Sequence, residues 1–235
     1  MKTIGIIGGL GPEATTDYYK EIIKSFNEMN SNASLNYPEI IIYSVNMGKF
    51  IEHIQKAEYT MATEYISSCI NRLANAGADF AAISANTPHM LFNEIQGKSN
   101  IPLISIVAAT KNEAQKLQLK KAGLIGTKFT MNSSFFKDVF QPSGIDIIVP
   151  SNFDIETINE KLFTELELGI YKPETQTLLL EIVQQMINRD KIDSLILGCT
   201  EFPIMFTNNQ YLGIPFLNTT RIHVAKIVDA CINSN

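Results

Sequence analysis

Tryptophan is absent from this 235-residue sequence, and cysteine, histidine and arginine occur only three times each. An odd number of cysteines with no Cys-x-x-Cys pair argues against a disulfide framework and against a structural zinc site. The histidines, His53, His89 and His223, are scattered along the chain, so no metal-ligand cluster can be read from the sequence. The sequence therefore indicates neither disulfide bonds nor a structural metal site.

Long apolar runs and runs of positive charge are missing too. No stretch reaches the roughly 18 apolar residues of a membrane span, and the opening MKTIGIIGG lacks the pattern of a cleavable secretory leader. A formal net charge of -5 without a basic run argues against nucleic acid as the main partner. We therefore expect a cytoplasmic protein that binds neither membrane nor nucleic acid, although a locally positive pocket can still hold a small anion.

What the sequence does contain is a regular alternation of short β-branched runs and helical patterns. The strand-like runs are 2–8, 39–45, 79–84, 101–107, 121–127, 145–150, 194–198 and 214–218. Helical patterns cover about 11–30, 57–76, 110–120, 131–141, 155–168, 173–189 and 219–232. Such alternation predicts right-handed βαβ units, a mostly parallel sheet and an α/β fold class.

Two segments of this pattern look like a repeat. KTIGIIGGLGPEAT and KAGLIGTKFTMNSS both read as a strand, a glycine, a polar turn and a helix. At a similar distance after each lie ANTPH, residues 85–89, and CTEFP, residues 199–203, each at the end of an expected strand. Ligands of open parallel sheets bind beyond the carboxyl ends of the strands. Two lobes facing each other would therefore bring both segments to one cleft.

GLGPEA at 9–14 satisfies the dinucleotide-binding fingerprint in the right strand–turn–helix context. Dinucleotide binding also needs an acidic residue at the end of the second strand, where residues 44–46 read Ser-Val-Asn. The missing acid argues against NAD. The leading interpretations are a tight structural turn before a helix, or a carboxylate site at Gly11 on the free N–H groups of that helix, with NAD binding as the third.

The three cysteines have different surroundings in the sequence. Cys69 and Cys231 lie on apolar helical stripes and are expected to be buried packing residues. Cys199 follows a strand and precedes a Thr-Glu pair, where a helix N-terminus could lower the pKa of its thiol. It is the candidate functional thiol, and a catalytic Cys–His pair would need His89 or His223 close by.

Other polar residues at the expected strand ends have two interpretations each. Glu201 is a candidate base, an acid that offsets a helix dipole, or a group that orients its neighbours. His89 either faces the cleft or caps its own lobe. Short hydroxyl and amide groups suit a small ligand with carboxylates, but they are also ordinary turn and cap residues; they are Asn86, Thr87, Thr127, Thr130 and Thr200.

Four stretches together resemble the aspartate/glutamate racemase superfamily, and within it the aspartate racemase branch. They are MKTIGIIGGLGPEAT at the start, ANTPH at 85–89, GLIGTKFTM at 123–131 and LGCTEFP at 197–203. The resemblance covers nearly the whole chain in order. It implies two Rossmann-like lobes related by a pseudo-two-fold axis with the active site between them, and commonly a homodimer. The lobes would comprise 1–100 with 208–235, whose helix returns to the first lobe, and 101–207.

The resemblance also implies chemistry without pyridoxal phosphate, metal or any other cofactor. Two cysteines face the α-carbon of a small dicarboxylic amino acid, aspartate or glutamate, and one removes the α-proton while the other returns a proton. The second cysteine site matches Cys199 with Thr200 and Glu201. The first cysteine site of the family, with the pattern Cys-Asn-Thr-x-His, falls on residues 85–89. Asn86, Thr87 and His89 match this pattern, but Ala85 occupies the position of the catalytic cysteine.

Half of the expected proton-transfer pair is therefore missing, and three functions stay open. They are a racemase that uses Cys199, a single-cysteine decarboxylase or isomerase of a related small acid, and an inactive protein that binds small acids. Ser84, a water molecule or His89 could replace the missing thiol. The residue that would bind the substrate's side-chain carboxylate is unassigned, because the chain has only three arginines, Arg72, Arg189 and Arg221. Lys49 and Lys161 are candidates on the basis of their charge and approximate position alone.

Overall fold

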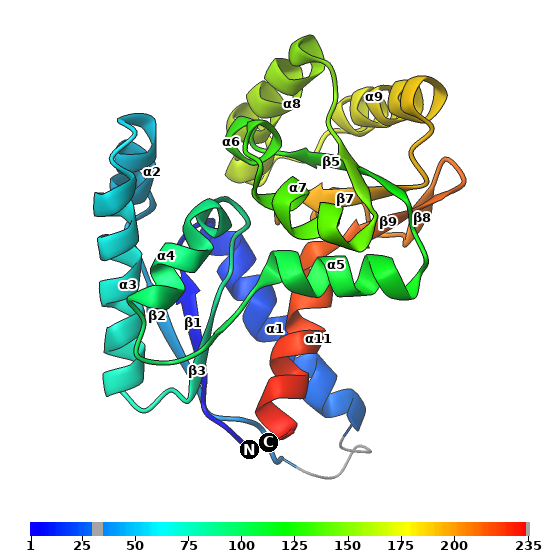
Figure 1. Cartoon of the computed structure of the whole chain (residues 1–235). Coiled ribbons are helices and arrows are strands. Elements are labelled where there is room, and N and C mark those ends of the chain that lie inside the picture. The colour runs from blue at the N-terminus through cyan, green and yellow to red at the C-terminus, as the bar shows by residue number, and fades with distance from the viewer. Residues whose placement is uncertain (30–34, 234–235) are drawn as a thin grey trace. The chain divides into compact units, whose positions relative to one another are not determined.

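The structure is a computed structural model that describes residues 1–29 and 35–233. Its chain divides into two compact units (Figure 1). The first unit comprises Met1–Ile106 and the C-terminal segment that begins at His223, and the second comprises Val107–Ile222. No helix in 1–29 or 35–233 is both long enough and apolar enough to cross a membrane.

The first unit is built on a four-stranded parallel sheet with the strand order β2-β1-β3-β4. The strands are β1 (Ile4–Gly8), β2 (Ile40–Ser44), β3 (Phe80–Ile83) and β4 (Leu103–Ile104). The helical segments are α1 (Pro12–Met29), α2 (Met47–Gln55), α3 (Tyr59–Asn75), η1 (Thr87–Leu91), α4 (Phe92–Gly97) and the last ten residues of α11 (Thr219–Ile232).

Helices cover both faces of this sheet (Figure 1). Successive strand residues point to opposite faces, so Ile4 and Ile6 of β1 meet α1 and α11, while Gly5 lies close to Leu73 of α3. Helix α1 buries Ala14, Tyr18, Ile22 and Phe26, which recur every four residues along one stripe. Each large apolar side chain buried in this way contributes about 1.5–3 kcal/mol.

The second unit is built on a five-stranded sheet with the order β6-β5-β7-β9-β8. The strands are β5 (Lys121–Gly126), β6 (Asp146–Ile148), β7 (Ser194–Gly198), β8 (Gln210–Tyr211) and β9 (Ile214–Asn218); β8 runs antiparallel to β9 and the other pairs are parallel. The helical segments are α5 (Ile106–Lys116), α6 (Lys128–Asn132), α7 (Phe135–Phe140), η2 (Gln141–Ser143), α8 (Asn152–Thr164), η3 (Leu166–Leu168), α9 (Pro173–Asp190) and α10 (Phe202–Met205).

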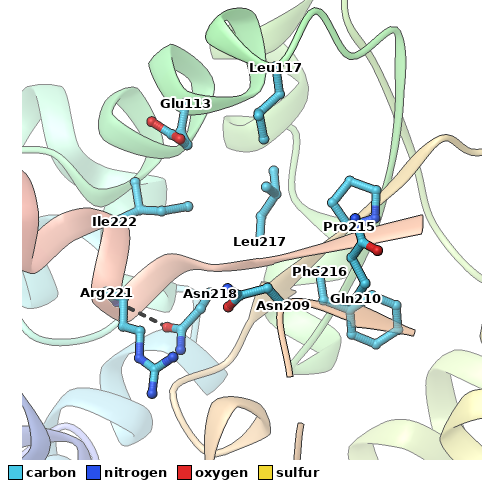
Figure 2. Close-up of a pocket in the computed structure, with 10 residues that line it drawn as sticks. All are labelled: Glu113, Leu117, Asn209, Gln210, Pro215, Phe216, Leu217, Asn218, Arg221 and Ile222. Carbon is cyan, nitrogen blue, oxygen red and sulfur yellow. Dashed lines mark hydrogen bonds between the residues drawn. The ribbon is translucent and has the colours of Figure 1, made fainter. Parts of the chain in front are cut away.

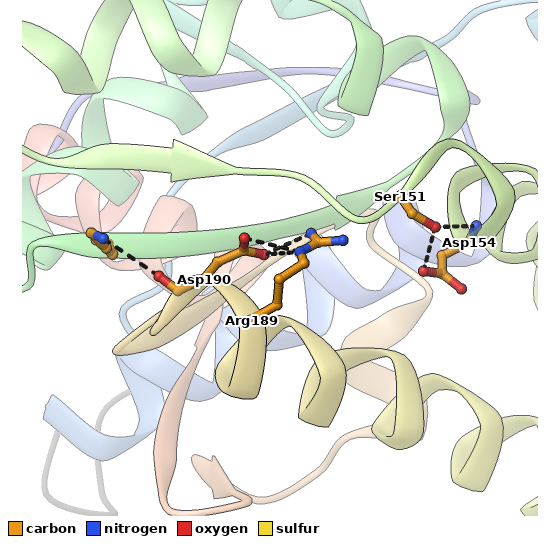
Figure 3. A network of polar contacts seen from close by, with 5 residues as sticks. Ser151, Asp154, Arg189 and Asp190 are labelled. Carbon is orange, nitrogen blue, oxygen red and sulfur yellow. Dashed lines mark hydrogen bonds and ion pairs between the residues drawn. The ribbon is translucent and has the colours of Figure 1, made fainter.

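Polar contacts fix the ends of α8 and α9 (Figure 3). The Ser151 hydroxyl caps α8 by accepting from the Asp154 N–H (3.2 Å) and donates to the Asp154 carboxylate (2.6 Å). At the end of α9, the Arg189 guanidinium holds the Asp190 carboxylate with bonds of 2.6–2.9 Å, and Lys121 donates to the Asp190 carbonyl. Exposed pairs of this kind are worth at most about 1 kcal/mol, so they define helix ends more than they stabilise the unit.

The α/β fold class with two mostly parallel sheets is confirmed. The expected strand at 101–107 is shortened to β4 because α5 already begins at Ile106. The helices α2, α4 and α10 and the strand β8 were not predicted. The last residue of the expected helix at 11–30 lies outside the described residues.

The expected lobe boundaries need correction at both ends. Residues 208–222 were assigned to the first lobe, but β9 pairs with β7 in the sheet of the second unit, and the chain passes to the first unit only at His223. Residues 101–106 were assigned to the second lobe, but β4 pairs with β3 in the first.

Candidate functional site

The turn after β1 is shaped by glycine. Gly9 has φ +78°, and a Cβ there would lie 2.4 Å from the Val45 carbonyl oxygen, so only glycine fits. The Thr15 hydroxyl accepts from the Gly9 N–H (2.9 Å) and donates to the Gly11 carbonyl (3.2 Å). Thr15 thus ties the backbone at the start of α1 into a tight turn.

The segment 84–88 follows β3 and contains no acidic or basic side chain. Ala85 and Asn86 are buried and Thr87 is half-buried, at the start of η1. The Ser84 hydroxyl is fully buried and donates to the Ile7 carbonyl (3.1 Å) within the first unit. This contact argues against Ser84 as a replacement for the missing thiol.

His89 is buried with both ring nitrogens in hydrogen bonds. The Ile106 N–H donates to Nε2 (3.3 Å), so Nε2 must be the unprotonated nitrogen, and Nδ1–H donates to the Ala85 carbonyl (3.0 Å). Burial, with a smaller effect of His223, lowers the pKa of His89 to about 3. The ring is therefore neutral at neutral pH and ties the Ala85 backbone to the start of α5, which fits the capping interpretation rather than proton transfer.

His223 is used in a similar way inside the first unit. Its Nε2–H donates to the Ile104 carbonyl (2.9 Å), and Nδ1 accepts from the Tyr18 hydroxyl (2.8 Å). Burial lowers the pKa of His223 to about 4 and raises that of Tyr18. Both histidines that could have paired with Cys199 thus serve as neutral hydrogen-bonding groups in the interior of the first unit.

In the second unit, the turn after β5 is capped by Thr127. Its hydroxyl accepts from the Thr130 N–H (3.2 Å) and donates to the Thr130 hydroxyl (3.1 Å). Both side chains are buried. These contacts favour the interpretation of the two threonines as helix-cap residues that shape the end of β5.

Cys199 lies directly after β7, buried among groups that carry acid–base chemistry. Its Sγ is 2.8 Å from Glu201 Oε2 and 4.0 Å from Glu167 Oε1. The Thr200 hydroxyl is 3.2 and 3.1 Å from the two carboxylate oxygens of Glu201. Glu201 is itself only 2% exposed, so a thiol and a carboxylate share a nearly dry site.

Burial and the carboxyl groups of Glu201 and Glu167 determine the pKa of the Cys199 thiol. Burial first, then the charges of Glu201 and Glu167, raise the pKa of Cys199 well above its ordinary value. The expectation that a helix N-terminus lowers this pKa is therefore wrong, since the following helix α10 has only four residues and a carboxylate stands against the sulfur. Burial and the Glu201 charge raise the pKa of Glu167 to about 8, so Glu167 is mostly protonated at neutral pH.

Glu167 was not predicted from the sequence. It lies on η3 in the stretch TELELG, which was expected to continue the helix at 155–168, whereas α8 ends at Thr164. Its distance of 32 residues from Cys199 leaves no local signal that the two meet. The tertiary fold brings this carboxyl to within 4.0 Å of the sulfur, and the neighbouring Leu166 is buried in the same core cluster as Cys199.

The ligand atoms of Glu167, Cys199 and Glu201 all lie within 4.8 Å of one another. That spacing would fit a divalent cation. At neutral pH, however, the thiol and Glu167 both hold protons, which makes this a poor donor set unless a metal displaces them. The arrangement suits proton transfer between sulfur and carboxylate directly.

The lysines considered for the distal carboxylate are engaged elsewhere. Lys161 donates to Glu165 Oε1 (2.9 Å), and Lys49 lies over the Tyr65 ring, 4.6 Å from its centroid. A separate cavity of about 310 Å³ in the second unit lies between α5, β8, β9 and the start of α11 (Figure 2). None of the predicted site residues lines it.

Comparison with known proteins gives one family. The family model described as Asp/Glu/Hydantoin racemase matches residues 7–227. The broad-specificity amino-acid racemase RacX of Bacillus subtilis is 25% identical over 218 residues, which are 92% of each chain. Two solved structures cover 99% of this chain and 100% of their own. One, from Yersinia pestis, has a TM-score of 0.88 at 28% identity. The other, an aspartate racemase homologue from Pyrococcus horikoshii, has a TM-score of 0.82 at 31% identity.

Proposed function

Because this chain belongs to the Asp/Glu/hydantoin racemase family, we propose that it racemises a small dicarboxylic amino acid, aspartate or glutamate, through Cys199. The observation that carries the proposal is the buried thiol 2.8 Å from the Glu201 carboxylate, with a second carboxyl 4.0 Å away. Such a site can take up and return a proton without metal or pyridoxal phosphate. Among these relatives, RacX is an amino-acid racemase and the Pyrococcus horikoshii protein is an aspartate racemase homologue, which supports the reaction class.

The proton on Cys199 has an acceptor in place. Glu201 accepts the thiol proton, and the thiolate so formed removes the substrate's α-proton, leaving a carbanion that is delocalised into the α-carboxylate. Glu167, protonated at neutral pH, adds no second negative charge and can donate a hydrogen bond to the thiolate. Because the pKa of the Cys199 thiol is raised, this thiolate is short-lived: it forms by proton transfer to Glu201 and is stabilised by the Glu167 hydrogen bond.

The opposite face of the substrate would meet Ala85, which carries no proton. We propose that a water molecule beside its methyl group protonates the carbanion there. The hydroxide left behind takes the proton from Glu201, so Cys199 ends as a thiol and Glu201 as a carboxylate. Removal and return of the proton on the Cys199 face alone gives exchange without inversion. Exchange is therefore expected to be faster than racemisation.

The substrate's carboxylates need donors from both units. We propose the Asn86 amide, the Thr87 hydroxyl and the N–H groups near Gly11 in the first unit. In the second unit we propose Thr200, with Thr127 and Thr130 shaping the end of β5. Preorganised donors of this kind stabilise the negative charge that develops on the α-carboxylate. The proposal also includes a cleft between the two units, a homodimer and a cytoplasmic location. Chelators and carbonyl reagents should leave the activity unchanged.

The proposal is tested by proton NMR of L- and D-aspartate and L- and D-glutamate in D₂O with the purified protein. We expect the α-proton signal to disappear, because each cycle at Cys199 brings in solvent deuterium. Cys199→Ala should abolish the exchange, while Cys69→Ala, which also shortens a buried cysteine, should retain it. No exchange with any of the four substrates would refute the proposal.

A further inference from the structure

Glu165 carries a buried carboxylate that the proposed chemistry does not use. The residue is 5% exposed and lies at the end of α8. Its Oε1 accepts from Lys161 Nζ (2.9 Å) and Lys172 Nζ (3.3 Å), and its Oε2 accepts from the Thr175 hydroxyl. The hydroxyl and the two ammonium groups hold the pKa of Glu165 down to about 2. One carboxylate thus joins the end of α8 to the start of α9.

The same residue closes the turn that carries Glu167. The Leu168 and Ile170 N–H groups both donate to the Glu165 carbonyl at 3.0 Å. The left-handed Gly169 (φ +73°) completes the turn, and Leu166 packs into the core. Glu167 therefore sits in a short loop whose backbone converges on Glu165, while the Glu165 side chain fastens that loop to α9.

We propose that Glu165 is a positioning residue: its contacts with Lys161, Lys172 and Thr175 hold the Glu167 carboxyl beside the Cys199 sulfur. This inference rests on the proposed role of Cys199. Removing the negative charge leaves two ammonium groups without their shared partner, so they repel each other and the turn loosens. Glu167 then moves away from the thiol without any change at the sulfur itself.

A purely structural role is the competing explanation, and it makes a different prediction. Buried ion pairs often contribute little net stability because desolvation offsets their attraction. Glu165 would then affect only the packing of α8 on α9. The pH dependence of Cys199 reactivity separates the two, since the groups that face the sulfur are Glu167 and Glu201, and Glu165 does not contact it in the hydrogen bonds described.

The test is the rate of Cys199 alkylation by iodoacetamide between about pH 6 and 10, followed by peptide mass spectrometry. In Glu165→Gln we expect alkylation near pH 8 to be about threefold faster. Glu167, with its pKa of about 8, is about half ionised at that pH, and its displacement removes a negative charge that raises the thiol pKa; the thiolate fraction changes tenfold per pKa unit. With substrate, kcat for α-proton exchange should fall about tenfold and KM should stay within about twofold.

Three further variants make the test decisive. Glu156→Gln, which removes an exposed ion pair of α8 with Lys128, should leave the profile unchanged. In a Glu167→Gln background, Glu165→Gln should have no additional effect. If Glu165→Gln does not fold, Thr175→Val removes one contact to the same carboxylate and should give a smaller shift in the same direction.

A lower melting temperature of Glu165→Gln with a wild-type Cys199 profile would overturn the inference. The alkylation assay needs no substrate. A shifted profile in a protein that exchanges no α-proton would therefore support the positioning role even though the proposed function had failed.

Discussion

At the scale of single residues, the surroundings of Cys199 decide its chemistry. The thiol of a cysteine in water has a pKa of about 8.5, and burial together with two carboxyl groups raises the pKa of Cys199 well above that value. The thiol is therefore a proton donor at rest and becomes a base only when Glu201, 2.8 Å away, accepts its proton. Ala85, the counterpart of Cys199 that the family resemblance indicates, offers no such group.

The first prediction at this scale concerns Ala85→Cys. A second thiol should supply the proton on the far face, so the rate of inversion should rise about tenfold or more toward the rate of α-proton exchange. Chiral chromatography of the product and proton NMR of the same sample measure the two rates. Ala85→Ser, with a hydroxyl of much higher pKa, is the matched control. An unchanged ratio of inversion to exchange would contradict the assignment of Ala85 to the reacting face.

At the scale of secondary-structure elements, the candidate residues lie where strands end and turns begin. Residues 84–88 follow β3, Thr127 follows β5 and Cys199 follows β7. Each turn is fixed by its own contacts. In the turn after β1, Gly9 lies close to the Val45 backbone, and in the turn after β5, Thr127 is hydrogen-bonded to Thr130. The turn at η3 depends instead on Glu165, which belongs to the helix before it and is held by the helix after it.

Gly9→Ala tests the first of these turns. Alanine must adopt φ +78° with its Cβ 2.4 Å from the Val45 carbonyl oxygen, and we expect a loss of about 2–3 kcal/mol in the free energy of unfolding. Urea denaturation measures it. Gly97→Ala is the control, since the helical Gly97 has no atom within 4 Å of the added Cβ and no positive φ. Equal stability of the two variants would show that the turn tolerates a side chain.

At the scale of the whole molecule, buried titratable groups make stability depend on pH. His89 and His223 have pKa values of about 3 and 4 in the folded chain, below the ordinary 6.5. As the pH falls, the two histidines take up protons in the unfolded chain before they do so in the folded chain. Their contribution to the free energy of unfolding is therefore complete above about pH 6.5 and is lost as the pH falls below it. Glu167 acts in the opposite direction, because its pKa of about 8 lies above the ordinary 4.5.

Between about pH 4.5 and 6.5 two histidines therefore oppose one carboxyl. The free energy of unfolding should fall by about 1.4 kcal/mol per pH unit on acidification, the effect of one net proton. Glu165 has a pKa of about 2 in the folded chain, below the ordinary 4.5. Its contribution to stability is therefore lost only below about pH 4.5, outside this range. Urea denaturation at several pH values measures the slope.

Glu167→Gln is the matched variant for this slope. It removes the opposing carboxyl and should bring the slope near 2.7 kcal/mol per pH unit, the effect of two protons. Stability that does not vary over this range in either protein would contradict the assignment of both histidines as buried and neutral.

The sequence by itself determined the elements, the fold class and the family. Periodicity, turn glycines and β-branched runs act over a few residues, so the strands were found nearly in place. The racemase family and the isomerase class inferred from four short motifs are confirmed. The residues of the predicted site stay a prediction, although the sequence correctly identified Cys69 and Cys231 as buried.

Only the tertiary structure decided what surrounds those residues. Glu167 reaches Cys199 across 32 residues, and Lys172, just before α9, and Thr175 of α9 contact Glu165. The Ile106 N–H decides which ring nitrogen of His89 carries the proton. The direction of the Cys199 pKa was wrong from sequence because burial and neighbouring charge depend on which segments pack together. Local patterns encode the elements, whereas distances between segments far apart in the chain set the protonation states on which the chemistry depends.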